Sequence, residues 1–219
     1  MSKQTIWNTL RHKGFSIEAA AAILGNMEAE SNCVSNRVQG DFSEGYENSA
    51  SYTRMVDEGK ISREAFIRSG PGGGGYGLMQ WTYPTRKAGL YDLANARGAS
   101  VGEEEIQLEW FMQELRQEEY GTLREILQCC SSIRQCSDAL VRRFLKPADQ
   151  SEAALQKRSD LARQMFDCFA GSEIENKVNA QPEEDGMVKI SEEEFRLYSK
   201  AVLVVMTLRD LLKMMEEYE

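Results

Sequence analysis

The chain has 219 residues, which is enough for one well-packed domain and a smaller additional segment. Its net charge is −9, and no run of lysine and arginine is long enough to form a nucleic-acid-binding patch, so the composition argues against a nucleic-acid-binding protein. No run of about 18 apolar residues is present, which excludes a membrane-spanning helix. The first residues contain no apolar stretch, so we expect no secretory signal peptide and synthesis in the cytoplasm.

Two helices are predicted at the N-terminal end. The first covers residues 3–11 and ends before Gly14. The second covers residues 17–31, is capped by Ser16, and contains a run of alanines with high helix propensity.

The pattern changes over residues 32–84, where glycine, serine and tyrosine are frequent and helical periodicity is lost. We expect loops and short strands there, with a helix near residues 49–58 and a turn capped by Ser62. Helical periodicity then returns in five segments, residues 85–97, 103–118, 121–130, 136–145 and 151–169. The sequence therefore predicts a mostly α-helical domain over residues 1–170 with one irregular insertion.

The rest of the chain divides into two parts. Residues 171–186 are polar and contain glycine and proline, which is typical of a linker. Residues 187–219 are predicted to form a separate amphipathic helix. Its apolar residues recur at alternating three- and four-residue steps, at Tyr198, Ala201, Val205, Leu208, Leu212 and Met215.

The cysteine and histidine content limits the possible metal and thiol chemistry. The five cysteines are odd in number and irregularly spaced, so we expect reduced thiols. His12 is the only histidine, which excludes a histidine-rich zinc site. We expect no metal cofactor.

Two glutamates lie near the end of the second helix, in the segment GNMEAESN (residues 25–32). On a helical wheel Glu30 shares a face with Ile23 and Met27, whereas Glu28 lies roughly opposite. An apolar cleft and the negative end of a helix dipole both favour a protonated carboxyl group, which a glycosidase needs to protonate a leaving oxygen. Glu30 is therefore the candidate catalytic acid, and a solvated helix end is the alternative interpretation.

A second candidate site is the glycine-rich segment PGGGGYGLMQW, residues 71–81. It matches the pattern GxGxxG, but no predicted strand precedes it and no Gly-Lys-Ser/Thr follows, so we expect no nucleotide cofactor. Glycine lets a ligand approach the backbone closely, and the side chains of Tyr76, Gln80 and Trp81 suit a saccharide. With Gly77 they are the predicted substrate-binding residues. The alternative interpretation is a mobile surface loop.

The two candidate segments together resemble a known family. AAAILGNMEAESN, followed later by GYGLMQWTYPTRKAGL, is similar to the phage tail-tip lysozyme family of the lysozyme superfamily. That superfamily also contains soluble lytic transglycosylases and goose-type lysozymes. The later segments IQLEWFMQEL and FLKPADQSEAALQKRSDLARQMF resemble the closing helices of the family, so the resemblance spans nearly all of residues 1–170.

This resemblance implies an α+β fold that is mostly α, with a lysozyme-like domain and a small β/loop subdomain that holds the cleft. It also implies that Glu30, the glutamate before the serine, is the catalytic acid. The second carboxylate stays open, because some members of the superfamily use one from the β region and transglycosylases use none. Asp41 and Glu44 are about equally good candidates, with Glu47 behind them.

The implied function is cleavage of the β-1,4 bond between N-acetylmuramic acid and N-acetylglucosamine in bacterial peptidoglycan. We expect a phage endolysin that reaches the cell wall after release by a holin. A lytic transglycosylase with 1,6-anhydro products and a non-catalytic glycan-binding phage protein are the alternatives.

The predicted helix within residues 187–219 would be marginal by itself in water, so we expect it to have a partner. Another copy of the chain would give a homo-oligomer, and folding back on the first domain would cover the apolar face internally. The codons of residues 183–187 can contain a ribosome-binding sequence before Met187. A free C-terminal fragment that starts at Met187 is therefore a further expected partner, in a complex that could increase avidity for the wall.

Overall fold

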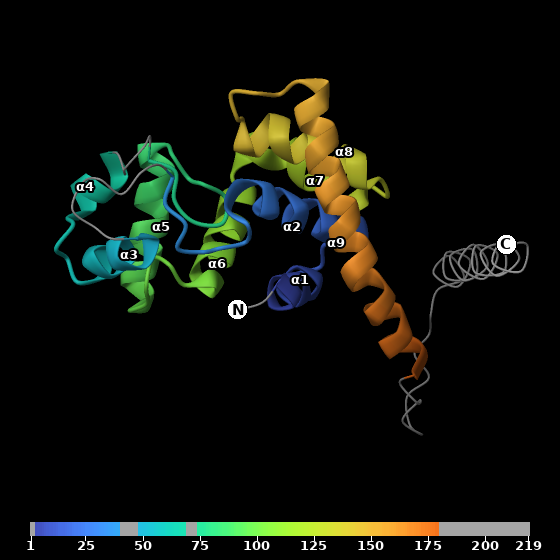
Figure 1. The fold of residues 1–219 in the computed structure, drawn as a ribbon, viewed down its shortest axis with the longest axis horizontal. Helices are drawn as coiled ribbons and strands as arrows, with labels where there is room; N and C mark the ends of the chain where they lie inside the picture. The colour runs from blue at the N-terminus through green and yellow to red at the C-terminus, as the bar shows by residue number, and fades with distance from the viewer. Residues whose placement is uncertain (1–2, 40–47, 69–73, 180–219) are drawn as a thin grey trace, which may run out of the picture. The chain divides into compact units, whose positions relative to one another are not determined.

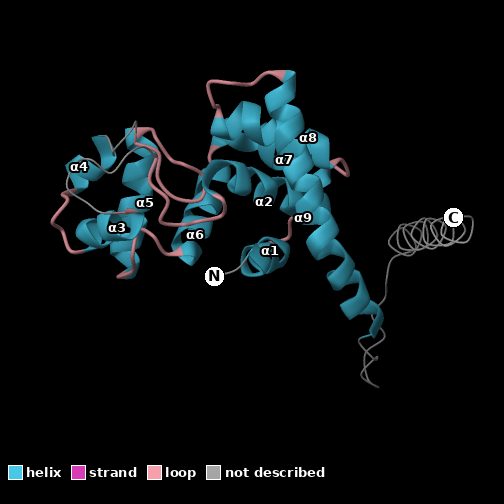
Figure 2. Ribbon diagram, viewed as in Figure 1, coloured by secondary structure: helices cyan, strands magenta, loops and turns pink. Residues whose placement is uncertain are grey.

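A computed structural model describes residues 3–39, 48–68 and 74–179, with side chains described through residue 171. Asp41, Glu44 and Glu47 lie outside the described residues, as do the predicted helical module and its Met187 start. The described chain is mostly helical, as the sequence predicted (Figures 1 and 2). Residues 1–175 form one compact unit.

Nine α-helices are present in the described part of the chain. Their bounds are α1 Lys3–His12, α2 Ile17–Ser31, α3 Ser49–Asp57, α4 Arg63–Arg68, α5 Pro84–Arg97, α6 Glu104–Leu115, α7 Gly121–Cys129, α8 Ile133–Leu140 and α9 Glu152–Asn179. A 3₁₀ turn, Glu118–Tyr120, precedes α7, and a π-helical turn, Val141–Leu145, follows α8. No helix among the described residues is long and apolar enough to cross a lipid bilayer.

Helix α2 lies at the centre of the compact unit. Its N-cap is Ser16, whose hydroxyl accepts a hydrogen bond from the backbone N–H of Ala19, and its C-cap Asn32 has a left-handed φ of 54°. Residues 19–27 are all buried, because α1 and α8 pack against this helix. A helix that is apolar on every side is expected to be enclosed by others in this way.

The region between α2 and α5 differs from the expected strands. Among the described residues it holds two isolated β-bridges, Val38 with Tyr76 and Tyr76 with Trp81, and no extended strand (Figure 2). Helices α3 and α4 also lie in this region, and α4 packs against α5. In Figure 1 these three helices are grouped on one side of α2, and α7, α8 and α9 on the other.

Helix α9 continues beyond its predicted end at residue 169 and reaches Asn179. The first nine residues of the predicted linker are therefore helical. A single glycine, Gly171, costs a helix only about 1 kcal/mol, and the first proline after it is Pro182, beyond the end of α9. The division into domains otherwise stays a prediction.

All five cysteines lie in the described residues and are free thiols. Cys33 and Cys136 are buried, whereas Cys129 and Cys168 are exposed. Burial raises the pKa of the Cys33 thiol to about 12, so this cysteine is a packing residue that stays protonated at neutral pH.

Candidate active site

The sequence Gly-Leu-Met-Gln forms the loop of a tight hairpin. Tyr76 and Trp81 exchange backbone hydrogen bonds of 3.1 Å and 3.0 Å, and the four residues between them make the turn. Gly77 has a φ of 77° and Gln80 a φ of 49°, so both ends of the turn are left-handed. Glycine adopts this conformation without strain, whereas for Gln80 it is uncommon and typical of functional sites.

The serine of the Glu-Ser pair connects this hairpin to helix α2. Ser31 is 2% exposed, and its Oγ lies 3.1 Å from the carbonyl oxygen of Leu78 and 3.0 Å from that of Met27. The two segments that carry the resemblance are therefore in direct contact, although 47 residues separate Ser31 from Leu78.

Gln107 on α6 supports the hairpin from the other side. Its side chain is fully buried, and its Oε1 accepts a hydrogen bond of 2.8 Å from the backbone N–H of Leu78. Its Nε2 donates to the carbonyl oxygens of Ser35 and Val101 at 2.6 Å and 2.8 Å. A Cβ added to Gly77 would lie 2.5 Å from Gln107 Oε1, so this glycine makes room for a neighbouring side chain of the protein. The role of Gly77 in glycan binding stays a prediction.

Tyr76 and Trp81 are each 1% exposed, which argues against the prediction that their rings contact the glycan. The Tyr76 hydroxyl lies 2.7 Å from Thr53 Oγ1, and Trp81 Nε1 donates to Glu114 Oε2 at 2.6 Å. Both polar atoms therefore have partners inside the protein, and both rings are part of the core beneath the hairpin.

Gln80 is the predicted substrate-binding residue that stays partly accessible. Its Nε2 donates to the carbonyl oxygens of Gly77, at 2.9 Å, and Arg37, at 3.2 Å. These two hydrogen bonds fix the orientation of the Gln80 side-chain amide. A role in glycan binding would use its Oε1, and this role stays a prediction.

The two glutamates near the C-terminal end of α2 contact different neighbours. Glu30 Oε1 lies 2.7 Å from Arg158 Nη2 of α9, and 16% of the Glu30 side chain is exposed. Glu28 Oε1 lies 2.8 Å from Lys3 Nζ of α1, and 20% of the Glu28 side chain is exposed. The two carboxylates therefore contact different helices, α1 for Glu28 and α9 for Glu30, and both are only partly exposed.

Comparison with protein-family models matches residues 2–169 to phage tail lysozymes. The chain belongs to the phage tail lysozyme family. No match to a curated protein was found. The match covers the same part of the chain as the resemblance seen in the sequence, and it supports a lysozyme-like, peptidoglycan-lytic function.

Sequence reasoning missed one exposed aromatic residue of this phage tail lysozyme domain. Among the described residues, the exposed large hydrophobic side chains are Val34, at 39%, and Tyr83, at 60%. Val34 follows Glu30 by four residues, and Tyr83 follows Gln80 by three. Nothing in the sequence favoured Tyr83 over Tyr76 and Trp81 as a glycan-binding ring. The structure favours Tyr83, because Tyr76 and Trp81 are buried and Tyr83 is exposed.

A cleft of about 680 Å³ lies elsewhere in the lysozyme-like domain, between the end of α1, α6 and α7. Gly14 and Phe15 line it and precede α2, whereas Glu30 lies in the last turn of α2. A helix of 15 residues is about 22 Å long. Neither Glu30 nor any residue of the hairpin 76–81 lines this cleft.

Proposed function

We propose that this member of the phage tail lysozyme family cleaves the β-1,4 bond between N-acetylmuramic acid and N-acetylglucosamine in peptidoglycan. The observation that carries the proposal is the contact between Ser31 Oγ and the Leu78 carbonyl oxygen. It brings the helix end that bears Glu30 next to the Gly-Leu-Met-Gln hairpin. A carboxyl group at the end of a rigid helix beside a loop of fixed backbone is a suitable arrangement for general acid catalysis.

In the proposed reaction Glu30 donates its proton to the glycosidic oxygen, and the bond from that oxygen to the anomeric carbon breaks. Either Asp41 or Glu44 then acts as the second carboxylate. As a base that activates water it would lie roughly 6.5–9.5 Å from Glu30, and as a nucleophile about 5–5.5 Å from it.

We propose an endolysin role for the chain, in which a holin releases the enzyme to the wall. This role extends the family assignment and the expectations from sequence. Expression in bacteria with and without a holin tests it, and lysis that requires the holin is the expected result. Equal lysis without a holin would contradict it.

The test of the activity is a digest of purified peptidoglycan, analysed by mass spectrometry of the released muropeptides. The wild type should release fragments with a reducing end, and Glu30→Gln should lower the rate by about 10²–10⁴-fold. Glu28→Gln is the matched control, because it removes a carboxylate two residues away and should keep nearly all of the activity.

Three outcomes of this digest would change the conclusion. Fragments with 1,6-anhydro ends would identify a lytic transglycosylase. Equal activity of Glu30→Gln and wild type would remove Glu30 from the mechanism. Wall binding by the wild type without any release of fragments would indicate a glycan-binding protein.

A further inference from the structure

Helices α2 and α9 pass each other at very short range. A Cβ added to Gly25 of α2 would lie 2.4 Å from the backbone of Ala162 in α9, so no side chain fits at this crossing. Arg158 lies one helical turn before Ala162 and therefore on the same face of α9. The close approach at Gly25 thus brings the face of α9 that bears Arg158 against α2.

The Arg158 guanidinium spans two residues of α2 that lie one turn apart. Nη2 is 2.7 Å from Glu30 Oε1, and Nη1 donates to Asn26 Oδ1 at 3.2 Å. The side chains of Arg158 and Glu30 are 15% and 16% exposed, so water screens this pair only weakly. Glu30 Oε1 is buried and makes no hydrogen bond to a described residue, so its contact with Arg158 is an ion pair.

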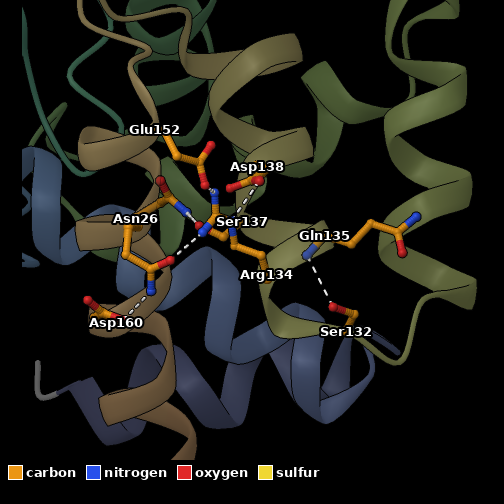
Figure 3. A network of polar contacts seen from close by, with 9 residues as sticks. Asn26, Ser132, Arg134, Gln135, Ser137, Asp138, Glu152 and Asp160 are labelled. Carbon is orange, nitrogen blue, oxygen red and sulfur yellow. Dashed lines mark hydrogen bonds and ion pairs between the residues drawn. The ribbon is translucent and has the colours of Figure 1, made fainter.

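Asn26 orients the Arg158 guanidinium through its side-chain oxygen. It is fully buried, and its Nδ2 donates to the Ala22 carbonyl oxygen at 2.9 Å and to Ser137 Oγ of α8 at 3.0 Å. Figure 3 shows the bond from Asn26 to Ser137. These two bonds use both amide protons, so the Asn26 oxygen is left to accept from Arg158. The orientation of Arg158 is thus determined by three helices.

We propose that Arg158 is a positioning residue for the catalytic acid. The inference rests on the proposed function, in which Glu30 protonates the leaving oxygen. Arg158 holds Oε1, so that Oε2 is the oxygen that carries the proton and faces the glycosidic bond. When the proton has passed to the leaving oxygen, the guanidinium stabilises the carboxylate that remains.

The structure provides a matched control for this role. Arg134 of α8 also reaches α9, where its Nη2 is 2.6 Å from Glu152 Oε1 and its Nη1 2.5 Å from Gln156 Oε1. Its Nε donates to Asp138 within α8 at 2.7 Å. Figure 3 shows this arginine among its partners. Arg134→Gln therefore removes a multiply bonded arginine between helices without touching Glu30.

The experiment measures kcat and KM on soluble peptidoglycan oligosaccharides, together with thermal unfolding, for Arg158→Gln, Arg158→Lys, Arg134→Gln and Glu30→Gln. Arg158→Gln should lower kcat about 10²-fold, the loss expected when a catalytic group is misplaced by about 1 Å, with KM little changed. Arg158→Lys should fall between Arg158→Gln and wild type, because an ammonium group keeps the charge but not the two-pronged contact. Arg134→Gln should keep the wild-type kcat.

The outcomes separate the positioning role from the proposed function. If Arg158→Gln keeps the wild-type kcat while Glu30→Gln is inactive, Arg158 has no positioning role and the proposed acid stands. If Arg158→Gln and Arg134→Gln lose kcat equally, the effect is structural and the positioning role is refuted. If Glu30→Gln stays active, both proposals fail. Should Arg158→Gln not fold, Arg158→Lys decides: a lowered kcat supports the role, and a wild-type kcat refutes it.

Discussion

The Ser31 hydroxyl oxygen lies 3.1 Å from the carbonyl oxygen of Leu78. Ser31 is the last residue of α2, and Leu78 is the second residue of the Gly-Leu-Met-Gln hairpin loop. This hydrogen bond places the hairpin relative to the last turn of α2, and therefore relative to Glu30.

Replacing Ser31 with alanine should remove this connection. The cost in stability is about 1–3 kcal/mol, because a buried carbonyl group loses its donor. The loss of wall-lytic activity should be larger than the stability change explains, on the order of 10²-fold, since the hairpin can then shift relative to Glu30. Ser132→Ala removes the N-cap of α8, with a cost of about 1 kcal/mol, and should leave activity intact. Equal activity loss in the two variants would argue against a special role for Ser31.

Gly77→Ala should destabilise the protein more than Gly98→Ala. Both glycines have positive φ, 77° and 64°, but only Gly77 faces a neighbour, Gln107 Oε1, at 2.5 Å from an added Cβ. Gln107 cannot move freely because its hydrogen bonds hold it in place. We expect roughly 3 kcal/mol for Gly77→Ala and about 1 kcal/mol for Gly98→Ala, measured by chemical denaturation. Similar values for the two would show that Gln107 yields easily.

Arg86→Met should destabilise the fold by about 3–5 kcal/mol. Arg86 Nε donates to Glu114 Oε1 at 2.5 Å, and only 2% of the Glu114 side chain is exposed. Burial raises the pKa of Glu114, while the hydrogen bonds from Arg86 and Trp81 act in the opposite direction. Without Arg86 the buried charge loses its main compensation. Adding Glu114→Gln to Arg86→Met should recover part of the lost unfolding free energy, and no recovery in that double variant would count against this account.

Lys87 should make the free energy of unfolding depend on pH in the alkaline range. Its side chain is 1% exposed, its Nζ donates to the Gly74 carbonyl oxygen at 3.1 Å, and it lies 4.7 Å from the centroid of the Phe66 ring. Burial lowers the pKa of Lys87 from 10.5 to about 8. Between these values the unfolded chain binds more protons than the folded one, so this residue makes the unfolding free energy rise with pH.

Lys87→Met should remove that rise. The stability of Lys87→Met relative to wild type should therefore fall between pH 8 and 10.5, by about 3 kcal/mol at most. Denaturant titrations of both proteins at several pH values measure it. A difference that is constant over this range would mean that the folded protein does not shift the titration of Lys87.

Tyr83→Ala should weaken glycan binding. The ring is 60% exposed and lies two residues after Trp81, the last residue of the hairpin, so it can cover the face of a sugar. We expect KM for soluble glycan to rise about tenfold, which corresponds to about 1.4 kcal/mol, with kcat and thermal stability nearly unchanged. Tyr83→Phe keeps the ring and should behave like the wild type. An unchanged KM in Tyr83→Ala would place the glycan away from this residue.

The sequence by itself determined most of the helices. Helix α2 begins and ends where its cap and alanine run predicted, and α1, α3, α5 and α7 agree within one residue at each end. The prediction was wrong for α4, which was expected as a turn, and α6, α8 and α9 differ by three or more residues at one end or both. These features depend on neighbours a few positions away in the chain, through caps, propensity and apolar periodicity. The resemblance of two segments to the phage tail lysozyme family was also visible in the sequence, and that resemblance implied Glu30 as the acid.

Only the tertiary structure decided what the candidate site residues contact. The glycine-rich segment predicted that Tyr76 and Trp81 are exposed binding residues. In the structure both are buried, and their polar atoms form hydrogen bonds with Thr53 and Glu114. The ion pair of Glu30 joins it to Arg158, which is 128 residues away, across the close approach of α2 and α9. Such contacts depend on how distant elements pack, because the direction of a side chain in a loop or between helices is set by the residues that surround it in space.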